Sequence, residues 1–351
     1  MISLQETLQR IQPADQRSGE LSKKRWDSIA KPLGSLGLLE EAVVRISSVQ
    51  GTADCRIDKR AVLIFCADNG VVCEGVTQCD SSVTAVVAGN FLSGDTSVCI
   101  MAGLAGADII PVDIGMNADV PGMISLKPRY GTGNIAREPA MSRQEAVRAV
   151  EAGIEMVRRL SEEGYQLIAT GEMGIGNTTT SSAVASALTG LSVREMTGRG
   201  AGLSSAGLVK KQTAIRQALE LHRPDPEDVV GVLAKVGGLD LAGLTGAFLG
   251  CAALKIPAVI DGFISATAAL CAVRLCPAAG EYLLASHQSG EPASRIIMEE
   301  LGLSPFLDAG MRLGEGTGAV AALPVLDMSL AVYRRMSTFE EIEIEAYQPL
   351  T

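Results

Sequence analysis

The residues best suited to chemistry lie in a glycine-rich segment at residues 170–180, which read TGEMGIGNTTT. An apolar run at 166–170 precedes the segment and a run of small residues at 180–188 follows it, which predicts a strand, a tight turn and a helix in that order. Glycines let a backbone approach a ligand closely, and the first turn of a helix favours negative charge. The segment therefore predicts a cradle for an anion such as a phosphate, although a simple turn before a capped helix would use the same residues.

Two features set this cradle apart from the common phosphate motifs. No lysine follows the second glycine, as it would in a Walker loop, and the third glycine of a dinucleotide-binding fingerprint is missing. In addition, Glu172 places a carboxylate inside the turn. A site that only holds phosphate would avoid this residue, so Glu172 indicates a role beyond anion binding.

A second reactive candidate is Glu315, which lies within residues 312–319, RLGEGTGA. The flanking glycines leave room for a flat ligand beside the carboxylate. If its surroundings are apolar, loss of hydration raises the pKa of Glu315 toward neutrality, which suits a general base. A solvated glutamate in a glycine-rich approach to a helix is the alternative that spacing alone leaves open.

Composition excludes several classes of partner. The chain has 351 residues and a formal net charge of -10, so neither nucleic acid nor an anionic membrane is expected as its main partner. The first residues lack the pattern of a signal peptide, and the apolar stretch at 241–254 is too short for a membrane span. Eight cysteines without a C-x-x-C pair and only two histidines predict reduced thiols in a cytoplasmic protein without a metal site.

Apolar runs alternate with helical patterns through the middle of the chain. Strands are expected at 61–67, 108–114, 166–170, 229–236, 256–262 and 281–286. Helices are expected at 82–102, 142–160, 180–188, 204–221, 239–254 and 265–273. This alternation predicts a doubly wound, mostly parallel α/β sheet of the Rossmann-like class over residues 55–290. Such sheets bind ligands at the carboxyl ends of their strands, which here carry the loops 68–75, 113–117, 171–177 and 261–265.

Both ends of the chain read as helical, with no strands to pair. Residues 1–54 contain a break between two helices at 31–37, KPLGSLG, and residues 291–351 include an acidic tail at 339–345. We therefore predict that 1–54 and 291–351 form a small helical lobe beside the α/β domain.

Five motifs in order along the chain carry a resemblance to a known family. They are KPLGSLG at 31–37, GEMGIGNTT at 171–179, DGFI at 261–264, SHQSGE at 286–291 and RLGEGTG at 312–318. Together they resemble the nicotinate-nucleotide:dimethylbenzimidazole phosphoribosyltransferases, which activate the lower ligand of cobamides. The resemblance covers essentially the whole chain, and the motifs at 171–179 and 312–318 are specific to that family.

The resemblance implies a reaction and a set of site residues. A free base attacks C1′ of nicotinate mononucleotide, nicotinate leaves, and the product is an α-riboside 5′-phosphate. The leaving group is a pyridinium, so the resemblance implies neither a metal nor another cofactor. The family's general base corresponds to Glu315, with Glu172 as a supporting carboxylate near the sugar or base. The residues expected to hold the phosphate and ribose are Gly174, Gly176, Asn177, Thr178, Gly202, Lys211, Gly262 and Ser289.

The predicted base pocket is where the sequence departs from the family. Its residues are Thr77, Gln78, Cys79, Val86, Met173 and Leu313. The stretch 75–80, GVTQCD, lacks the family's usual aromatic residue and proline, and Val86 stands where a glutamine is common. The acceptor is therefore left open among dimethylbenzimidazole, another benzimidazole, a purine and a phenol.

Three functional hypotheses follow. The first is an active phosphoribosyltransferase of cobamide synthesis, and the second is one subunit of a heteromeric homologue that acts on phenol or p-cresol. The third is a nucleotide-binding paralogue without catalytic activity. The resemblance also implies a homodimer or a heterodimer with a paralogue as the assembly.

Overall fold

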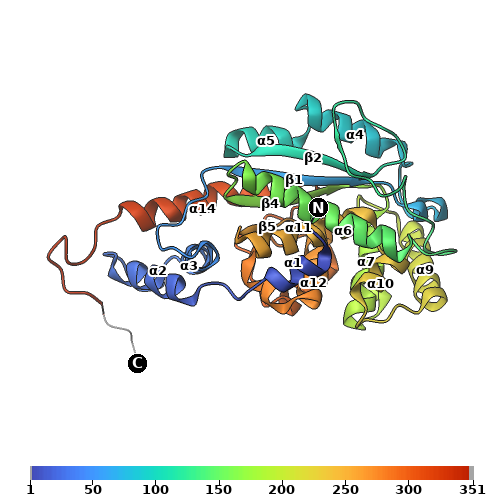
Figure 1. The fold of residues 1–351 in the computed structure, drawn as a ribbon. Coiled ribbons are helices and arrows are strands. Elements are labelled where there is room, and N and C mark those ends of the chain that lie inside the picture. The colour runs from blue at the N-terminus through green and yellow to red at the C-terminus, as the bar shows by residue number, and fades with distance from the viewer. Residues whose placement is uncertain (1, 348–351) are drawn as a thin grey trace.

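The computed structural model describes residues 2–347 and places a six-stranded, all-parallel sheet at the centre of the molecule (Figure 1). The strands lie in the order β3-β2-β1-β4-β5-β6. Their bounds are β1 Arg60–Ala67, β2 Asp108–Gly115, β3 Ile124–Ser125, β4 Leu167–Met173, β5 Ala258–Ile260 and β6 Leu283–Ala285. The prediction of a doubly wound sheet is confirmed, and the sheet is wholly rather than mostly parallel.

Strand β1 lies at the centre of the sheet because it is apolar on both faces. It pairs with β2 on one side and with β4 on the other, and every residue in it is buried. Leu63 and Phe65 face one layer of helices, whereas Val62 and Ile64 face the other. The chain builds β2 and β3 beside β1 and then returns to build β4, β5 and β6 on the opposite side. The order thus reverses between β1 and β4, where doubly wound sheets leave a crevice for ligands.

Helices and their connections cover both faces of the sheet (Figure 1). The buried cluster on the first face includes residues of α1 Leu4–Arg10, α6 Arg143–Glu162, α7 Asn177–Thr189, α8 Val193–Met196, α9 Ser205–His222, α10 Val229–Val236, α11 Leu239–Leu254, α12 Phe263–Leu275, η2 Pro277–Tyr282 and α13 Pro292–Glu300. Of these helices, α11 and α12 contact the strands directly. The buried cluster on the second face includes residues of α2 Gln16–Ser28, α3 Leu38–Gln50, α4 Ser82–Ser93, α5 Ser97–Ala105 and α14 Thr317–Arg335, of which α4, α5 and α14 contact the strands directly. A short helix, η1 Gly70–Glu74, follows β1.

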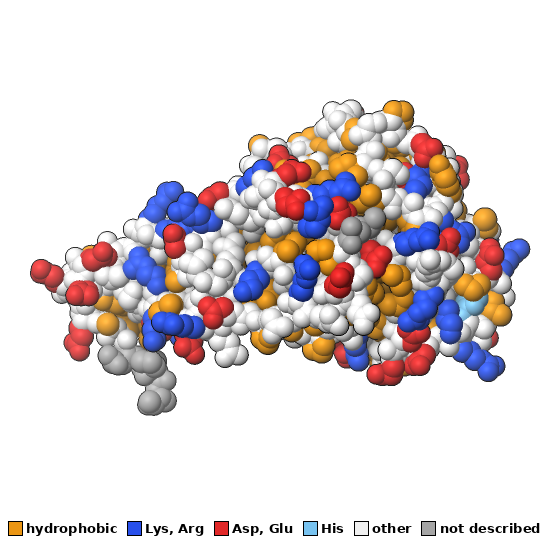
Figure 2. Space-filling view, viewed as in Figure 1, with side chains coloured by type: hydrophobic (Ala, Val, Ile, Leu, Met, Phe, Trp, Pro, Cys, Tyr) orange, Lys and Arg blue, Asp and Glu red, His pale blue; other side chains and the backbone are white. Residues whose placement is uncertain are grey.

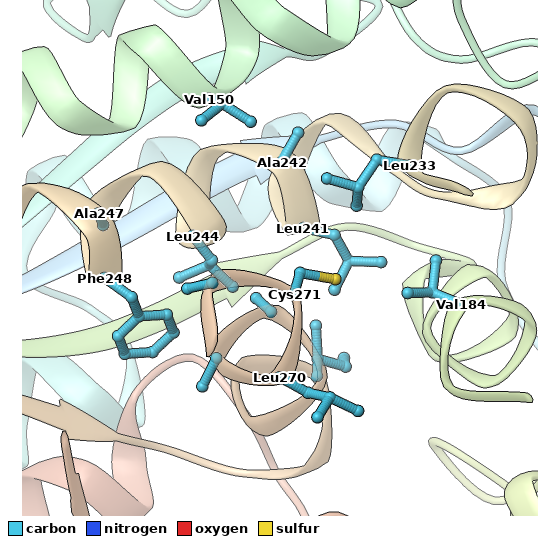
Figure 3. Close-up of a cluster of buried hydrophobic side chains, with 14 of the residues drawn as sticks. Val150, Val184, Leu233, Leu241, Ala242, Leu244, Ala247, Phe248, Leu270 and Cys271 are labelled. Atoms are coloured by element: carbon cyan, nitrogen blue, oxygen red, sulfur yellow. The ribbon is translucent and has the colours of Figure 1, made fainter. Parts of the chain in front are cut away.

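Helix α11 is apolar on nearly all sides, and it lies enclosed between α6, α12 and the sheet. Small residues permit the close approach to α6, since a Cβ on Gly246 would lie 1.8 Å from the backbone oxygen of Val150. Figure 3 shows Leu241 and Leu244 directed toward α12 and Ala242 directed toward α6. Helix α11 also packs against β1 and β4.

The prediction of a strand at 229–236 is wrong. Residues Val229–Val236 form helix α10, which Asp228 caps by accepting a hydrogen bond from the backbone N–H of Gly231 at 3.1 Å. Val229, Val232 and Val236 recur at helical spacing and are buried. The β-branched valines favoured a strand locally, but the cap and the buried face decide for a helix.

The apolar segment predicted as one helix at 82–102 is divided into two. α4 ends at Gly94, which has a φ of +79°, and Thr96 caps α5 by accepting from the backbone N–H of Cys99. By length and composition alone, Ser82–Ala105 is apolar enough to cross a membrane. At about 1.5 Å per residue, neither half is long enough to cross a hydrocarbon core of about 30 Å.

The terminal helices divide between two places. α1 packs against α6 and α11 on the main body, whereas α2 packs against α3 (Figure 1). α14 contacts β4 and α5 and continues to α3, and a bridge between Ile29 and Thr338 joins the two ends of the chain. Helices α2, α3 and α14 thus lie together, while the division into a lobe of 1–54 and 291–351 and a domain of 55–290 stays a prediction. Residues 1 and 348–351 of that lobe lie outside the described residues.

Candidate active site

A cavity of about 440 Å³ opens at the carboxyl edge of the sheet. The ends of β4, β5 and β6 and the approach to α14 line it, and the loops at 76–79 and 199–203 complete its wall. Its size falls in the range that holds small-molecule ligands. The cavity lies beside the point where the strand order reverses, as expected for a doubly wound sheet.

The glycine turn at 174–176 forms one wall of the cavity. β4 ends at Met173, Gly176 has a φ of +93°, and α7 begins at Asn177. Among the described residues no side chain caps α7. The backbone N–H groups of Asn177 and Thr179 donate to the oxygens of Gly174 and Gly176, so those of Gly176 and Thr178 are the ones left to receive an anion. A Cβ on Gly174 would lie 2.5 Å from the backbone oxygen of Ala67, so this position has no room for a side chain.

A buried lysine lies directly behind the turn. Lys211 Nζ donates to Thr178 Oγ1 at 2.7 Å and to the backbone oxygen of Gly198 at 3.3 Å. Burial lowers the pKa of Lys211 to about 8, and the charge of Glu291 acts in the opposite direction. Lys211 thus places a positive charge one hydrogen bond away from the anion cradle.

The loop at 198–203 closes the cavity beside this lysine. The backbone N–H of Gly200 donates to Glu291 Oε1 at 2.9 Å, while Glu291 Oε2 is buried without a hydrogen-bond partner among the described residues. Arg199 lines the cavity and donates to the backbone oxygen of Leu203 at 2.7 Å. The loop is therefore held by one carboxylate and one guanidinium, both of which border the cavity.

Glu315 lies on the opposite wall in a left-handed turn. Its φ is +62°, and the φ angles of Gly314 and Gly316 are +87° and +91°. The turn crosses β4 so closely that a Cβ on Gly171 would lie 2.7 Å from the backbone oxygen of Glu315. Burial and the charge of Asp261 raise the pKa of Glu315, which favours its action as a general base.

Asp261 holds this turn from the end of β5. Asp261 Oδ2 accepts from the backbone N–H of Gly316 at 3.2 Å, and Oδ1 accepts from those of Gly318 and Ala319 at 2.8 and 3.0 Å. The carboxyl is only 2% exposed. Burial raises the pKa of Asp261, whereas His287 and the three N–H donors act in the opposite direction.

The environment of Glu172 accounts for a carboxyl group inside an anion cradle. Its side chain is buried and accepts a hydrogen bond from the amide of Asn177. Burial, followed by the nearby charges of Asp240 and Asp261, holds the pKa of Glu172 well above its usual range. A neutral carboxyl group neither repels a phosphate nor needs a cation, and it can donate a hydrogen bond.

Asp240 lies beneath the same turn at the start of α11. It is fully buried, and its Oδ2 has no hydrogen-bond partner among the described residues. Burial raises the pKa of Asp240 to about 6, although hydrogen bonds from Leu241 and Asn177 act against this shift. A Cβ on Gly174 would lie 2.8 Å from Oδ2, so the carboxyl directly supports the turn.

Comparisons with known proteins agree with this geometry. The chain matches the family described as phosphoribosyltransferase over residues 11–344. A nicotinate-nucleotide–dimethylbenzimidazole phosphoribosyltransferase from Ruminiclostridium cellulolyticum is 48% identical over 99% of this chain and 100% of its own length. One of the same name from Acetivibrio thermocellus is 49% identical over 98% of this chain and 99% of its own length. This chain belongs to the nicotinate-nucleotide–dimethylbenzimidazole phosphoribosyltransferase family.

A solved structure extends the likeness to the fold. The crystal structure of CobT from Thermus thermophilus superposes with a TM-score of 0.90 at 38% identity, and the match covers 94% of this chain and 100% of that one. The resemblance read from the sequence motifs is therefore confirmed. The chain is an enzyme of the phosphoribosyltransferase class.

The cavity of this phosphoribosyltransferase brings together most of the residues predicted for its site. Those that line it are Thr77, Gln78, Cys79, Glu172, Met173, Gly174, Gly176, Asn177, Thr178, Gly262, Ser289, Leu313 and Glu315. Lys211 lies behind the wall, and Gly202 accepts a hydrogen bond from the side-chain amide of Gln78 through its backbone oxygen. The individual roles of these residues stay predictions.

One residue of the predicted base pocket lies elsewhere. Val86 is on α4, is 61% exposed and is absent from the cavity lining. Its side chain belongs to an apolar surface of α4 and α5, so the single chain does not bring Val86 together with Thr77, Gln78 and Cys79. The sequence motif placed Val86 beside these residues because it could not show which face of the helix meets the cavity.

Sequence reasoning missed the part played by several charged residues at this site. Asp261, His287 and Arg312 lie within quoted motifs and line the cavity, but they were given no role. Asp240 lies in an apolar stretch and approaches the turn only through the packing of α11. The strand-to-Asp-Gly pattern at 256–262 was the available signal for Asp261, whereas Asp240 had none.

Proposed function

We propose that this chain transfers the 5-phosphoribosyl group of nicotinate mononucleotide to a lower-ligand base in cobamide synthesis. The observation that carries the proposal is the pairing of two walls in one cavity. One wall is an uncapped helix N-terminus backed by Lys211, and the other is Glu315 with a raised pKa. An anion and a proton donor can therefore bind the same cavity at separate positions. The names of the relatives from Ruminiclostridium cellulolyticum and Acetivibrio thermocellus suggest the two substrates.

The phosphate of the nucleotide would bind at the glycine turn. Gly176 and Thr178 present backbone N–H groups at the start of α7, Thr178 adds a hydroxyl, and Lys211 supports Thr178. Burial raises the pKa of Glu172 and so favours its neutral form, which does not oppose a phosphate from within the turn. The arrangement gives local donors to an anionic substrate in a chain whose net charge is -10.

The base would react at the other wall. Its unprotonated nitrogen attacks C1′ while the bond from C1′ to the pyridinium nitrogen breaks, and that nitrogen takes the bonding electrons. Nicotinate thus leaves without gaining negative charge on its ring nitrogen, and the N–H proton of the attacking base passes to Glu315. Burial and the charge of Asp261 raise the pKa of Glu315, which makes it a better acceptor for this proton.

Glu172 fits a supporting role between these two events. In its neutral form it can donate a hydrogen bond to the sugar or to the base, and its neighbour Gly314 links it to the turn of Glu315. A Cβ on Gly314 would approach Glu172 Oε1 to 2.8 Å. The side chain of Glu172 therefore reaches the turn of Glu315 at a position without a side chain of its own.

The choice of acceptor would depend on the loop that holds Thr77, Gln78 and Cys79 on the cavity wall. We propose dimethylbenzimidazole as the first candidate, as the names of the relatives suggest. Purines and phenols are the alternatives, because Gln78 and Cys79 give this wall a polar amide and a thiol. A phenol has a high pKa, so its deprotonation would require Glu315 to be a stronger proton acceptor.

We further propose that the enzyme is a homodimer formed through α4 and α5. These helices expose apolar side chains to solvent, including Leu92, Ile100 and Leu104, which is 89% exposed. Figure 2 shows hydrophobic side chains at the surface along the top of the molecule, where α4 and α5 lie in Figure 1. Exposed apolar surfaces of this kind mark interfaces between proteins. Sedimentation should give a dimer for the parent and a monomer for Leu104→Lys, with Leu221→Lys on α9 as a matched control. A parent that stays monomeric at all concentrations would contradict the homodimer and leave a partner paralogue to be sought.

The activity is tested by mixing the protein with nicotinate mononucleotide and a panel of benzimidazoles, purines and phenols. Chromatography should detect equal amounts of free nicotinate and of one phosphorylated riboside. Turnover with one acceptor class identifies the base. The proposal fails if the parent binds nicotinate mononucleotide but releases no nicotinate with any acceptor, which would instead support a binding paralogue. Activity that requires a second homologous chain would support the heteromeric alternative.

A further inference from the structure

The carboxyl group that follows β5 does more than border the cavity. We propose that Asp261 is a positioning residue of the reaction, which fixes the left-handed turn at 314–316 and so holds the carboxylate of Glu315 at the cavity. This inference rests on the proposed function, because it names the group that keeps the general base in place.

The turn needs an external support. Gly314, Glu315 and Gly316 adopt positive φ angles in succession, and Glu315 carries a Cβ that disfavours this conformation. Such a conformation persists only when surrounding groups hold it. The first N–H groups of α14 also have no acceptor within their own helix. Asp261 meets both needs, since it accepts from Gly316 at 3.2 Å and from Gly318 at 2.8 Å.

Asp261 is itself well anchored. It directly follows β5, whose last residue Ile260 pairs with Ala285 of β6. Its backbone N–H donates to Ser265 Oγ at 3.2 Å, and its side chain is 2% exposed. Both of its oxygens accept N–H donors, which is the arrangement expected of an ionised carboxylate. The support therefore reaches from the sheet to the start of α14 through a single rigid side chain.

The charge of Asp261 gives its role a distinct signature. After burial, that charge is the second cause of the raised pKa of Glu315. The ionisable groups around the pair are Glu172 from β4, Asp240 from α11, His287 from the end of β6 and Arg312 from the approach to α14. Removing the charge of Asp261 alone should lower the pKa of Glu315, because burial and the other groups remain.

Two variants separate the charge from the geometry. Asp261→Asn removes the charge and one acceptor while keeping the size of the side chain. Gly316→Ala keeps Asp261 but adds a Cβ in a left-handed position, 2.7 Å from a methyl group of Val62. Asp113→Asn is the matched control, because Asp113 lies near the end of β2 and accepts from the backbone N–H groups of Gly115 and Met116, outside the cavity.

The kinetic test uses the full chain with nicotinate mononucleotide and the best acceptor. We expect Asp261→Asn to lower kcat by about 10- to 100-fold, as a misplaced catalytic group does, with KM for the nucleotide changed by less than about threefold. The acidic limb of its pH profile should move to lower pH. Gly316→Ala should lose kcat with an unmoved limb, and Asp113→Asn should keep both. An Asp261→Asn enzyme with parental kcat and an unmoved limb would overturn the proposal.

A second readout does not depend on turnover. Hydrogen exchange of peptides covering 312–322 should be faster in Asp261→Asn than in the parent and unchanged in Asp113→Asn, because the lost acceptor protected the amides of Gly316, Gly318 and Ala319. Unchanged exchange in Asp261→Asn would overturn the positioning role even if the parent proved inactive. An inactive parent with the expected exchange would instead refute the proposed function alone.

Discussion

The two halves of the sheet both end their strands in buried carboxyl groups, yet only one half carries the cavity. In the half with β2, Lys127 Nζ lies 2.6 Å from Asp113 Oδ2 and 2.8 Å from Asp119 Oδ1. Backbone N–H groups of Gly115 and Met116 bind the remaining oxygen of Asp113. Charge and hydrogen bonding are therefore balanced at Asp113.

The half with β4 and β5 lacks that balance. In the part of the chain that the structure describes, no lysine or arginine forms an ion pair with Glu172, Asp240, Asp261 or Glu315. The buried Lys211 is instead bonded to Thr178 and to the backbone of Gly198. Burial without a cation raises the pKa of all four carboxyl groups.

The difference shows that the same sheet holds ion-paired carboxylates, which stabilise loops, and unpaired buried carboxyl groups, which are candidates for proton transfer. A strand-end carboxylate beside a lysine stays charged and stabilises its loop, whereas burial at the same position without a cation raises the pKa of the carboxyl group. The fold places a carboxyl group at the end of a strand, and the neighbouring charges determine the pKa of that group.

The largest effect is expected at Glu315. Replacing it by glutamine keeps the shape of the turn but removes the proton acceptor, so kcat should fall by about 10²- to 10⁴-fold. Binding of nicotinate mononucleotide, followed by calorimetry, should stay close to that of the parent. Glu155→Gln on α6 is a control for the loss of a buried carboxylate outside the cavity. Parental turnover in Glu315→Gln would show that another group takes the proton.

In the half with β2, loss of the ion pair between Lys127 and Asp113 should lower the free energy of unfolding rather than kcat. Lys127→Met leaves Asp113 buried without its cation, which costs about 3–5 kcal/mol of unfolding free energy for a buried pair. Urea unfolding measures this loss, and kcat of the folded enzyme should change little. The matched control is Lys23→Met in the exposed pair with Asp27, where the loss should stay below about 1 kcal/mol. Equal losses in the two variants would contradict the comparison between the halves.

Asp240 should make the cavity half less stable as the pH rises. Its pKa is raised from 3.8 to about 6 in the folded chain, so its contribution is present in acid and is lost as the pH rises from about 4 to about 6. The difference in unfolding free energy between the parent and Asp240→Asn should therefore fall by up to about 3 kcal/mol over that window. Urea unfolding at several pH values measures it. A difference that does not vary with pH would mean that Asp240 is not perturbed.

A smaller effect is expected at Lys211. Lys211→Met removes a charged donor from Thr178, so KM for nicotinate mononucleotide should rise by about 10- to 100-fold, the worth of one charge-assisted hydrogen bond. Lys210→Met, which changes the exposed neighbour on the same helix, is the control. If both variants raise KM equally, long-range charge rather than the bond to Thr178 holds the phosphate.

The sequence predicted the two functional turns better than the groups that tune them. The glycine turn at 174–176 and Glu315 were accessible because local glycine spacing and family motifs mark them. Asp240 and Asp261 act through contacts between segments far apart in the chain, which spacing cannot show. The prediction of a strand at 229–236 failed because the β-branched valines of α10 favour strands locally. The cap at Asp228 and the burial of one face favour a helix instead.

The central claim is that Glu172, in the cavity half, is held neutral because it is buried without a cation. Carbon-13 NMR of the glutamate carboxyl groups, assigned with Glu172→Gln, tests this most directly. The Glu172 signal should keep the chemical shift of a protonated carboxyl group at neutral pH. Glu155, whose pKa its hydrogen bond to Arg158 lowers to about 2, should appear ionised and serve as the internal reference. A Glu172 signal that titrates near about 4.3, the value of a free glutamate, would contradict the account.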